Sequence, residues 1–362
     1  MSGDSTTQRK SGNDPAGNEA NNSGISTIST NDLNDRRSND STRIVDVRPV
    51  DAYNGWKLHD EKRGGHIKGA KSVPFKWQKY IDWIEIVQSK DILPQHAIIV
   101  YGYDKAETLR VAQQFLKAGY SDVSVYNGFV EEWSERENLP LDSLARYRQL
   151  VPASWVNELL ETGSAPELTN NKYVVCHAHY RNRADYELGH IPGSHAIDTL
   201  SLESPETWNR RSPNEIRETL EKLGISHDTT VILYGRFSFP DNSDPFPGSS
   251  AGHLGAIRCA MIMMYAGVKD VRVLNGGIQS WLDDGYALSA AESPEHTRVD
   301  FGAKIPGNPE IIVDMPGAKE ILQSQKKNLV SVRSWAEYIG EVSGYNYIEK
   351  KGRIPGSVFG NC

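Results

Sequence analysis

The sequence repeats itself at a distance of 148 residues. Residues 118–133 read AGYSDVSVYNGFVEEW and residues 266–281 read AGVKDVRVLNGGIQSW, so eight of sixteen positions carry the same residue. Similarity of this kind indicates that one structural unit occurs more than once. At 362 residues, the chain is long enough for two or three domains that each bury a core.

A second motif, Gly-x-Ile-x-Gly, occurs three times along the chain. Each copy follows a short apolar stretch, and the copies lie at residues 65–69, 189–193 and 352–356. Only the first two copies are followed by an Asn-Gly-x-x-x-x-Trp ending. The sequence therefore predicts two complete units and the beginning of a third.

Strand and helix patterns alternate within each complete unit. The apolar runs 97–101 and 230–234 are typical of buried parallel strands. The next segment of each unit has apolar residues at helical spacing, namely Leu109, Ala112, Phe115 and Leu116 in the first and Ile257, Met261 and Met264 in the second. This order predicts an α/β fold in which helices cover both faces of a central parallel sheet.

The Asp46-Val47-Arg48 opening, the Gly-x-Ile-x-Gly turn and the Asn-Gly ending together resemble the rhodanese family of sulfurtransferases. The order of units resembles the three-domain bacterial thiosulfate sulfurtransferases. This resemblance implies rhodanese-like domains at 41–145 and 150–290 and a truncated start of a third domain at 310–362. Residues 1–40 contain no aromatic residue and few apolar ones, so we expect a disordered leader there.

The resemblance also implies a reaction. A cysteine thiolate takes the sulfane sulfur of a donor such as thiosulfate, holds it as a persulfide and passes it to cyanide or a thiol. The family pattern places this cysteine directly after the second apolar strand, where this chain has Gly102 and Gly235. Glycine has no side chain that could act as a nucleophile. We therefore expect no catalytic residue in either complete domain, and a catalytic loop in the part of the third domain that lies beyond residue 362.

The three cysteines are expected to have structural roles. Cys259 lies in a predicted helix, and Cys176 is interpreted as the equivalent of Asp46 at the end of the opening strand. Cys362 follows the third Gly-x-Ile-x-Gly turn and is not at the position of a catalytic loop. Their odd number and wide spacing do not suggest a disulfide framework, which favours a reducing compartment.

Histidines gather beside one of these cysteines. His177 and His179 follow Cys176, and His190 and His195 lie a little further along. In a strand, alternation places His177 and His179 on one face and Cys176 on the other, so a tetrahedral ligand set is not delivered. We expect neither a metal nor a bound cofactor here.

Charge and hydropathy exclude two other classes of protein. The net charge of −7 comes without a basic cluster, which argues against nucleic-acid binding. No stretch of about 18 apolar residues suggests a membrane span, and residues 1–40 contain no signal-peptide core. We expect a cytoplasmic protein whose partners are a sulfane-sulfur donor and a thiol or cyanide acceptor.

The two complete units differ in one loop. The distance from Tyr101 to Asn127 is 26 residues, but that from Tyr234 to Asn275 is 41 residues. The insertion, around residues 237–248, is either an ordinary surface loop or a segment that packs over a neighbouring domain or the catalytic site. Two functions also stay open: a sulfurtransferase whose catalytic part is the third domain, and a non-catalytic rhodanese-like binding or scaffold module.

Overall fold

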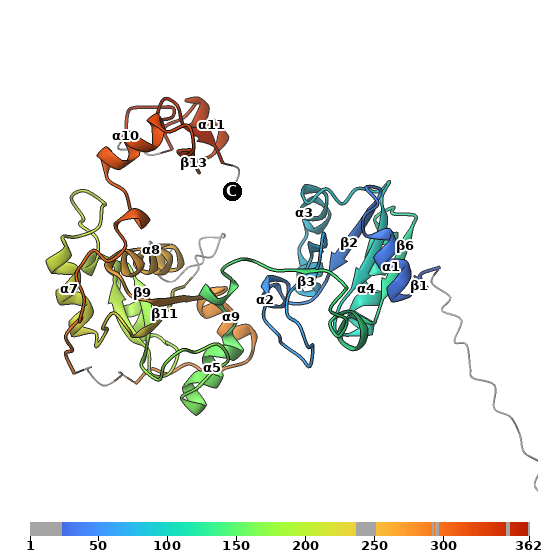
Figure 1. The fold of residues 1–362 in the computed structure, drawn as a ribbon, viewed down its shortest axis with the longest axis horizontal. Helices are drawn as coiled ribbons and strands as arrows, with labels where there is room; N and C mark the ends of the chain where they lie inside the picture. Colours follow the sequence, from blue (N-terminus) through green and yellow to red (C-terminus); the bar gives the residue numbers. More distant parts are fainter. Residues whose placement is uncertain (1–23, 237–250, 292, 294–296, 345–347, 361–362) are drawn as a thin grey trace, which may run out of the picture. The chain divides into compact units, whose positions relative to one another are not determined.

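The chain forms two compact units in a computed structural model, Met1–Tyr147 and Arg148–Cys362 (Figure 1). The structure describes residues 24–236, 251–291, 293, 297–344 and 348–360. The predicted insertion at 237–248 lies outside the described residues, and so does Cys362.

The first unit contains a five-stranded parallel sheet in the order β1-β6-β5-β2-β4. Its strands are β1 (Ser26–Thr27), β2 (Thr42–Asp46), β4 (Lys71–Ser72), β5 (Ala97–Tyr101) and β6 (Val123–Tyr126). A small antiparallel pair joins β3 (His66–Ile67) to β7 (Leu141–Asp142). The run 97–101 is thus confirmed as the central strand, as its uniformly apolar sequence predicted.

Helices cover both faces of this sheet. One apolar cluster joins the sheet to α3 (Trp83–Ser89) and α4 (Lys105–Lys117), and a second joins it to α1 (Thr30–Arg36) and η2 (Phe129–Trp133). The unit also contains α2 (Val50–Asn54) and η1 (Phe75–Lys79). The predicted arrangement of a parallel sheet between helices is confirmed.

The first domain starts earlier than predicted. Residues 24–40, which were expected to belong to a disordered leader, include β1 and α1, and β1 pairs with β6 in the sheet. Leu33 of α1 is fully buried, and Ser29 caps the helix through a capping box with Asp32. The few apolar residues in this polar stretch are therefore core residues, and average composition concealed them.

The second unit repeats the architecture with the strand order β10-β9-β11-β12-β8, all parallel. The strands are β8 (Leu150–Val151), β9 (Tyr173–His179), β10 (His195–Asp198), β11 (Thr230–Tyr234) and β12 (Asp270–Leu274). The connecting elements are η3 (Tyr147–Gln149), α5 (Ala153–Thr162), α6 (Ala184–Glu187), η4 (Thr199–Ser201), α7 (Pro213–Lys222), α8 (Ala251–Ala266) and α9 (Gly277–Asp283).

The buried face of α8 differs from the prediction. Of the three residues at helical spacing, Met264 packs against the core, but Ile257 and Met261 are about 40% exposed. Cys259 and Met263 are fully buried. The opposite side of the helix, which carries small apolar residues, packs on the sheet. Because α8 is apolar on both sides, helical spacing could not identify the inner face.

The second domain extends beyond the predicted end at residue 290. Phe301 and Ile305 belong to the same apolar cluster as β9, β11, α7 and α8. We call residues 298–314 the strap. Asn308 donates from its backbone to the Tyr265 carbonyl and from its side chain to the Met264 carbonyl, at 3.1 and 2.8 Å. The strap contains η5 (Pro309–Ile311) and packs on α7 and α8.

The residues after the strap form small elements with little core of their own. They are α10 (Met315–Gln323), β13 (Val330–Ser331), α11 (Trp335–Ile339) and β14 (Val358–Phe359), and β13 pairs in parallel with β14. We call residues 315–360 the C-terminal segment. Val330, Val332 and Trp335 are largely exposed, as expected for a sheet whose partner strands are not among the described elements.

Candidate functional site

The carboxyl ends of β2 and β5 carry a buried ion pair in the first domain. The register pairs Asp46 with Tyr101, and both side chains are fully buried. Arg48 Nε donates to Asp46 Oδ1 at 2.9 Å and Nη2 donates to Oδ2 at 2.6 Å. The Tyr101 hydroxyl donates to Asp46 Oδ2 at 2.6 Å. Each carboxylate oxygen therefore has a donor, as a buried charge requires.

Aromatic rings enclose the cation of this pair. The Arg48 guanidinium lies 3.8 Å from the centroid of the Phe129 ring, and its Nη2 also donates to the Gly65 carbonyl at 2.7 Å. Burial opposes ionisation, but Asp46 raises the pKa of Arg48, so the guanidinium keeps its charge. Next to it, the Tyr103 hydroxyl donates to Glu61. These contacts fill the place where the family pattern puts the catalytic loop.

The first loop has no room for a cysteine. A Cβ atom on Gly102 would lie 2.7 Å from both Thr108 Oγ1 and Val47 Cγ2. Contacts that short require the neighbouring atoms to move. The glycine therefore provides no nucleophile, and the loop is closely packed around it. We call this arrangement the closed first loop.

The equivalent position in the second domain carries a different set of side chains. The register pairs Tyr234 with His177, so His177, and not Cys176 as predicted, corresponds to Asp46. The Tyr234 hydroxyl hydrogen-bonds the Ser194 hydroxyl at 2.7 Å and accepts from the Ile191 amide at 2.9 Å. Cys176 and His177 are neighbours in the strand, and a shift of one residue exchanges the two faces of the sheet.

A carboxylate with two basic neighbours lies at this end of the second sheet. Arg236, the residue after Gly235, donates to Asp185 Oδ1 at 2.5 Å. His177 Nε2 lies 3.8 Å from Asp185 Oδ2, which is longer than a hydrogen bond. Burial lowers the pKa of His177. Burial also opposes ionisation of Asp185, but His177 and Arg236 together lower its pKa. Arg236 thus makes the short contact to Asp185, and His177 lies further from the carboxylate.

Neither described cysteine can act as a nucleophile in this conformation. Cys176 and Cys259 are fully buried, and both belong to the apolar cluster between the sheet and α8. Burial raises the pKa of Cys176 to about 12 and that of Cys259 further. A thiol with such a pKa stays protonated at neutral pH.

The structure of β9 shows on which side of the sheet Cys176 and His177 lie. Cys176 faces the α8 side of the sheet, while His177 stacks on Tyr234 with a centroid distance of 4.8 Å on the other side. The predicted alternation is confirmed. Within the described ranges, no three His, Cys, Asp or Glu side chains are placed to hold a metal ion. His190 binds backbone carbonyls of Tyr186 and Ala291, which is a structural role.

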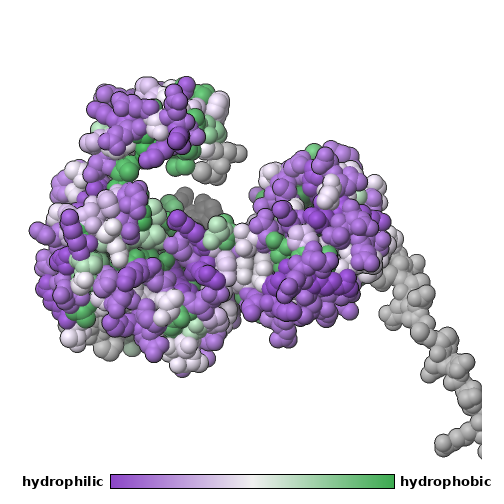
Figure 2. All heavy atoms as spheres, viewed as in Figure 1, coloured by the Kyte–Doolittle hydropathy of each residue, from purple (hydrophilic) through white to green (hydrophobic). Residues whose placement is uncertain are grey.

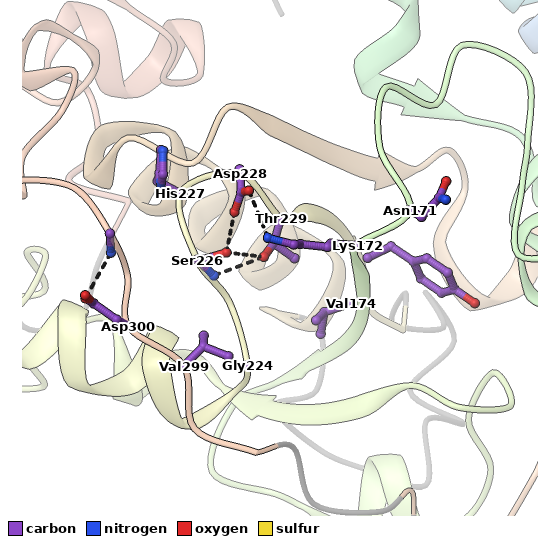
Figure 3. Close-up of a pocket in the computed structure, with 12 residues that line it drawn as sticks. Asn171, Lys172, Val174, Gly224, Ser226, His227, Asp228, Thr229, Val299 and Asp300 are labelled. Atoms are coloured by element: carbon purple, nitrogen blue, oxygen red, sulfur yellow. Dashed lines mark hydrogen bonds and ion pairs between the residues drawn. The ribbon is translucent and has the colours of Figure 1, made fainter.

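The second domain has a hollow of about 570 Å³ at the opposite edge of its sheet (Figure 3). It lies between the amino ends of β9 and β11 and the strap, and its walls include Lys172, His227 and Asp300. It contains one charge pair, in which Lys172 Nζ contacts Asp228 Oδ2 at 3.0 Å, and Ser226 donates to the other Asp228 oxygen. Asp300 accepts from the Gly302 amide. This hollow is remote from Gly235, which follows the carboxyl end of β11.

Comparison with known proteins agrees with this repeated architecture. The model of the rhodanese-like domain matches residues 29–136 and 165–284. The chain belongs to the rhodanese-like family. The first match starts at Ser29, the N-cap of α1, in agreement with the earlier start of the first domain.

Rhodanese-like relatives cover most of the chain. The thiosulfate sulfurtransferase YnjE of Escherichia coli (strain K12) is 34% identical over 91% of this chain and 72% of its own length. The sulfur carrier protein TtuD of Thermus thermophilus is 28% identical over 58% of this chain and 67% of its own.

Solved structures of EanB are more similar. The wild-type structure is 55% identical and has a TM-score of 0.88, covering 93% of this chain and 78% of that one. Other EanB structures are described as complexes with hercynine, and one as ergothioneine covalently linked with a cysteine persulfide. The family is therefore the one that the sequence motifs predicted.

Sequence reasoning missed the polar groups around the two loops. The Asp46-Val47-Arg48 motif was recognised as a family signature, but its buried ion pair was not predicted. The Asp185–Arg236 pair was missed because the partners are 51 residues apart. A signal for the first pair was present, since a charged residue inside an apolar strand run is buried only with a partner of opposite charge.

None of the helices in the described part of the chain has the length and apolar character of a membrane span.

Proposed function

We propose that the chain belongs to a persulfide-dependent sulfurtransferase in which the two complete rhodanese-like domains carry no catalytic thiol. In this proposal the sulfur-carrying cysteine belongs to a third rhodanese-type domain, which residues 310–362 begin. The observation that carries the proposal is the pair Gly102 and Gly235, which replace the thiol at both loops of a family defined by that thiol. The buried Cys176 and Cys259 offer no substitute.

We propose further that the sulfur acceptor is an imidazole betaine of the hercynine type. EanB, at 54–55% identity, supports this more strongly than YnjE at 34%, and EanB structures contain hercynine or ergothioneine. In such a transfer, the outer sulfur of an enzyme persulfide, R–S–SH, bonds to C2 of the imidazole. The S–S bond breaks and C2 loses its hydrogen as a proton, so the products are a thione and R–SH. The sulfane sulfur is the oxidant, and no further co-reactant is needed.

A domain exchange tests this proposal. Residues 1–314 of this chain would be joined to the part of EanB that follows the equivalent position. The 362-residue chain and the chimera would be incubated with hercynine or cyanide and with polysulfide or thiosulfate, while ergothioneine and thiocyanate are followed. We expect no turnover by the 362-residue chain. We expect ergothioneine from the chimera.

A cysteine series provides the control. Cys176→Ser, Cys259→Ser and Cys362→Ser in the 362-residue chain should leave its background rate unchanged. If the 362-residue chain turns over, and one substitution abolishes that turnover, the nucleophile is among these three thiols and the proposal is wrong.

The second candidate function is a non-catalytic rhodanese-like binding or scaffold module. The closed first loop favours it, because Gly102 is packed against Thr108 and Val47 and the Arg48 guanidinium lies over the ring of the next residue, Tyr103. A folded chimera that produces neither ergothioneine nor thiocyanate would support this alternative over the sulfurtransferase.

A further inference from the structure

One side of α8 presents apolar side chains to solvent. Leu254, Ile257 and Met261 are 62%, 40% and 39% exposed. Their spacing of three and four residues places them in one row along the helix. We call these three residues the α8 row. The other side of α8 is buried against the sheet, so the row is not needed for the core of the second domain.

The strap fixes the chain at the end of this row. Tyr265 lies one turn beyond Met261, and its carbonyl accepts from the Asn308 amide at 3.1 Å. The Arg210 guanidinium lies 4.5 Å from the centroid of the Tyr265 ring. Arg210 also binds both oxygens of Asp314 at 2.8 Å each, so the last residue of the strap is held beside the C-terminal end of α8.

The chain enters the C-terminal segment directly from this anchor. Asp314 is the N-cap of α10, so no flexible linker separates the anchored residue from the helix. The distance along α8 from Tyr265 to Leu254, at the far end of the row, is about 16 Å at 1.5 Å per residue, which is comparable to the length of α10. A tether this short gives the segment a high effective concentration at the row.

Apolar side chains lie on both sides of the anchored Asp314. Val313 at the end of the strap is 44% exposed, and Met315 at the start of α10 is 69% exposed. Apolar side chains reach the surface over α8 and around α10 and α11 (Figure 2). Two apolar surfaces joined by an anchored strap favour burial against each other.

We propose that the α8 row is the docking surface for the third rhodanese-type domain, whose beginning is the C-terminal segment. The contact that the strap already makes with α8 continues along the helix from Tyr265 through Met261 and Ile257 to Leu254. The Arg258–Glu203 ion pair, at 2.5 Å, lies at the edge of the row and provides a polar rim. The second domain would thereby hold the third domain in a fixed orientation. This inference rests on the third domain of the proposed function, but it does not depend on where a persulfide forms.

Site-directed cross-linking tests the contact in the whole chain. Met261→Cys, in a Cys362→Ser background, would be labelled with a thiol-reactive benzophenone, since the buried cysteines are not expected to react. After irradiation and digestion, we expect links from position 261 to residues 315–360 that do not depend on protein concentration. Links to residues 24–147 or to a second molecule, or the absence of links to 315–360, would overturn the proposal.

A matched control comes from the other side of the sheet. Leu282 on α9 is 40% exposed, like Ile257, but it is not in the α8 row. Leu282→Cys should give no link to residues 315–360. Ile257→Lys should raise the rate of proteolysis within 315–360 roughly threefold or more, because a charge in a dry contact opposes association. Leu282→Lys should not, and equal effects of the two lysines would contradict the proposal. Neither measurement follows sulfur transfer, so failure here leaves the proposed function standing.

Discussion

Replacing Asp46 by Asn should destabilise the first domain far more than its single lost charge suggests at first sight. Asp46 Oδ1 accepts from the backbone and Nε of Arg48, and Oδ2 accepts from Arg48 Nη2 and the Tyr101 hydroxyl. The asparagine oxygen can satisfy two of these donors, while its NH₂ group faces the other two. Hydrogen bonds to a charged partner contribute about 1.5–3 kcal/mol each, so two lost bonds amount to about 3–6 kcal/mol.

A second argument gives a similar magnitude. Removing one partner of a buried ion pair costs about 3–5 kcal/mol, because the other charge stays buried without compensation. Arg48 is fully buried and keeps its charge, so Asp46→Asn meets that condition. We therefore expect the free energy of unfolding of the first domain to fall by about 3–5 kcal/mol.

Hydrogen exchange followed by mass spectrometry provides the assay. Peptides from β2 and β5 report opening of the first domain, and peptides from β9 and β11 serve as an internal reference in the second. The control is Asp91→Asn, whose partner Arg43 lies at the same 2.6 Å but whose side chain is 64% exposed. That variant should lose much less stability, because solvent screens an exposed ion pair. Equal losses for the two variants would refute the argument that burial decides the energy of this pair.

Three further results are expected. Gly102→Cys should destabilise the first domain by about 1–3 kcal/mol, because the new side chain overpacks the loop. After treatment with polysulfide, mass spectrometry should detect no persulfide at this cysteine. A stable persulfide there would contradict the closed loop. Iodoacetamide at pH 8 should leave Cys176 and Cys259 unmodified in the folded chain. Burial raises the pKa of Cys176 to about 12 and that of Cys259 further, so both thiols stay protonated. Rapid labelling would show that the second domain opens to a conformation in which these thiols are exposed. Burial lowers the pKa of His177, so below about pH 6.5 the unfolded state binds a proton that the folded state does not. The free energy of unfolding of the second domain should therefore fall as the pH drops below about 6.5. Urea unfolding at each pH measures this effect, which should be smaller in His177→Gln.

The sequence predicted the features that depend on local pattern. The strands at 97–101 and 230–234 were found at their residues, because an uninterrupted apolar run bounded by polar residues suits a buried parallel strand. The repeated Asn-Gly endings likewise predicted the number of complete domains, which the family matches confirm.

Features that depend on register and on distant partners could not be predicted in this way. The correspondence of His177 with Asp46 follows from pairing with Tyr234 and Tyr101, and no property of the single strand distinguishes it from Cys176. For a related reason, helical spacing identified the buried face of α8 only in part, because a helix that is apolar on two sides gives no signal for which side packs on the sheet. The elements β1 and α1 were missed because three buried residues, Ile25, Ile28 and Leu33, are few among the polar residues of 1–40.

The strap also bears on how the chain folds during synthesis. Phe301 and Ile305 are core residues of a domain whose last strand, β12, ends at Leu274. The apolar cluster of this domain is therefore incomplete until about thirty more residues have left the ribosome, and β9, β11 and α8 must wait for them. A second domain excised at residue 290 would expose that cluster to solvent and to aggregation, whereas one that ends after Ile312 would retain its full core.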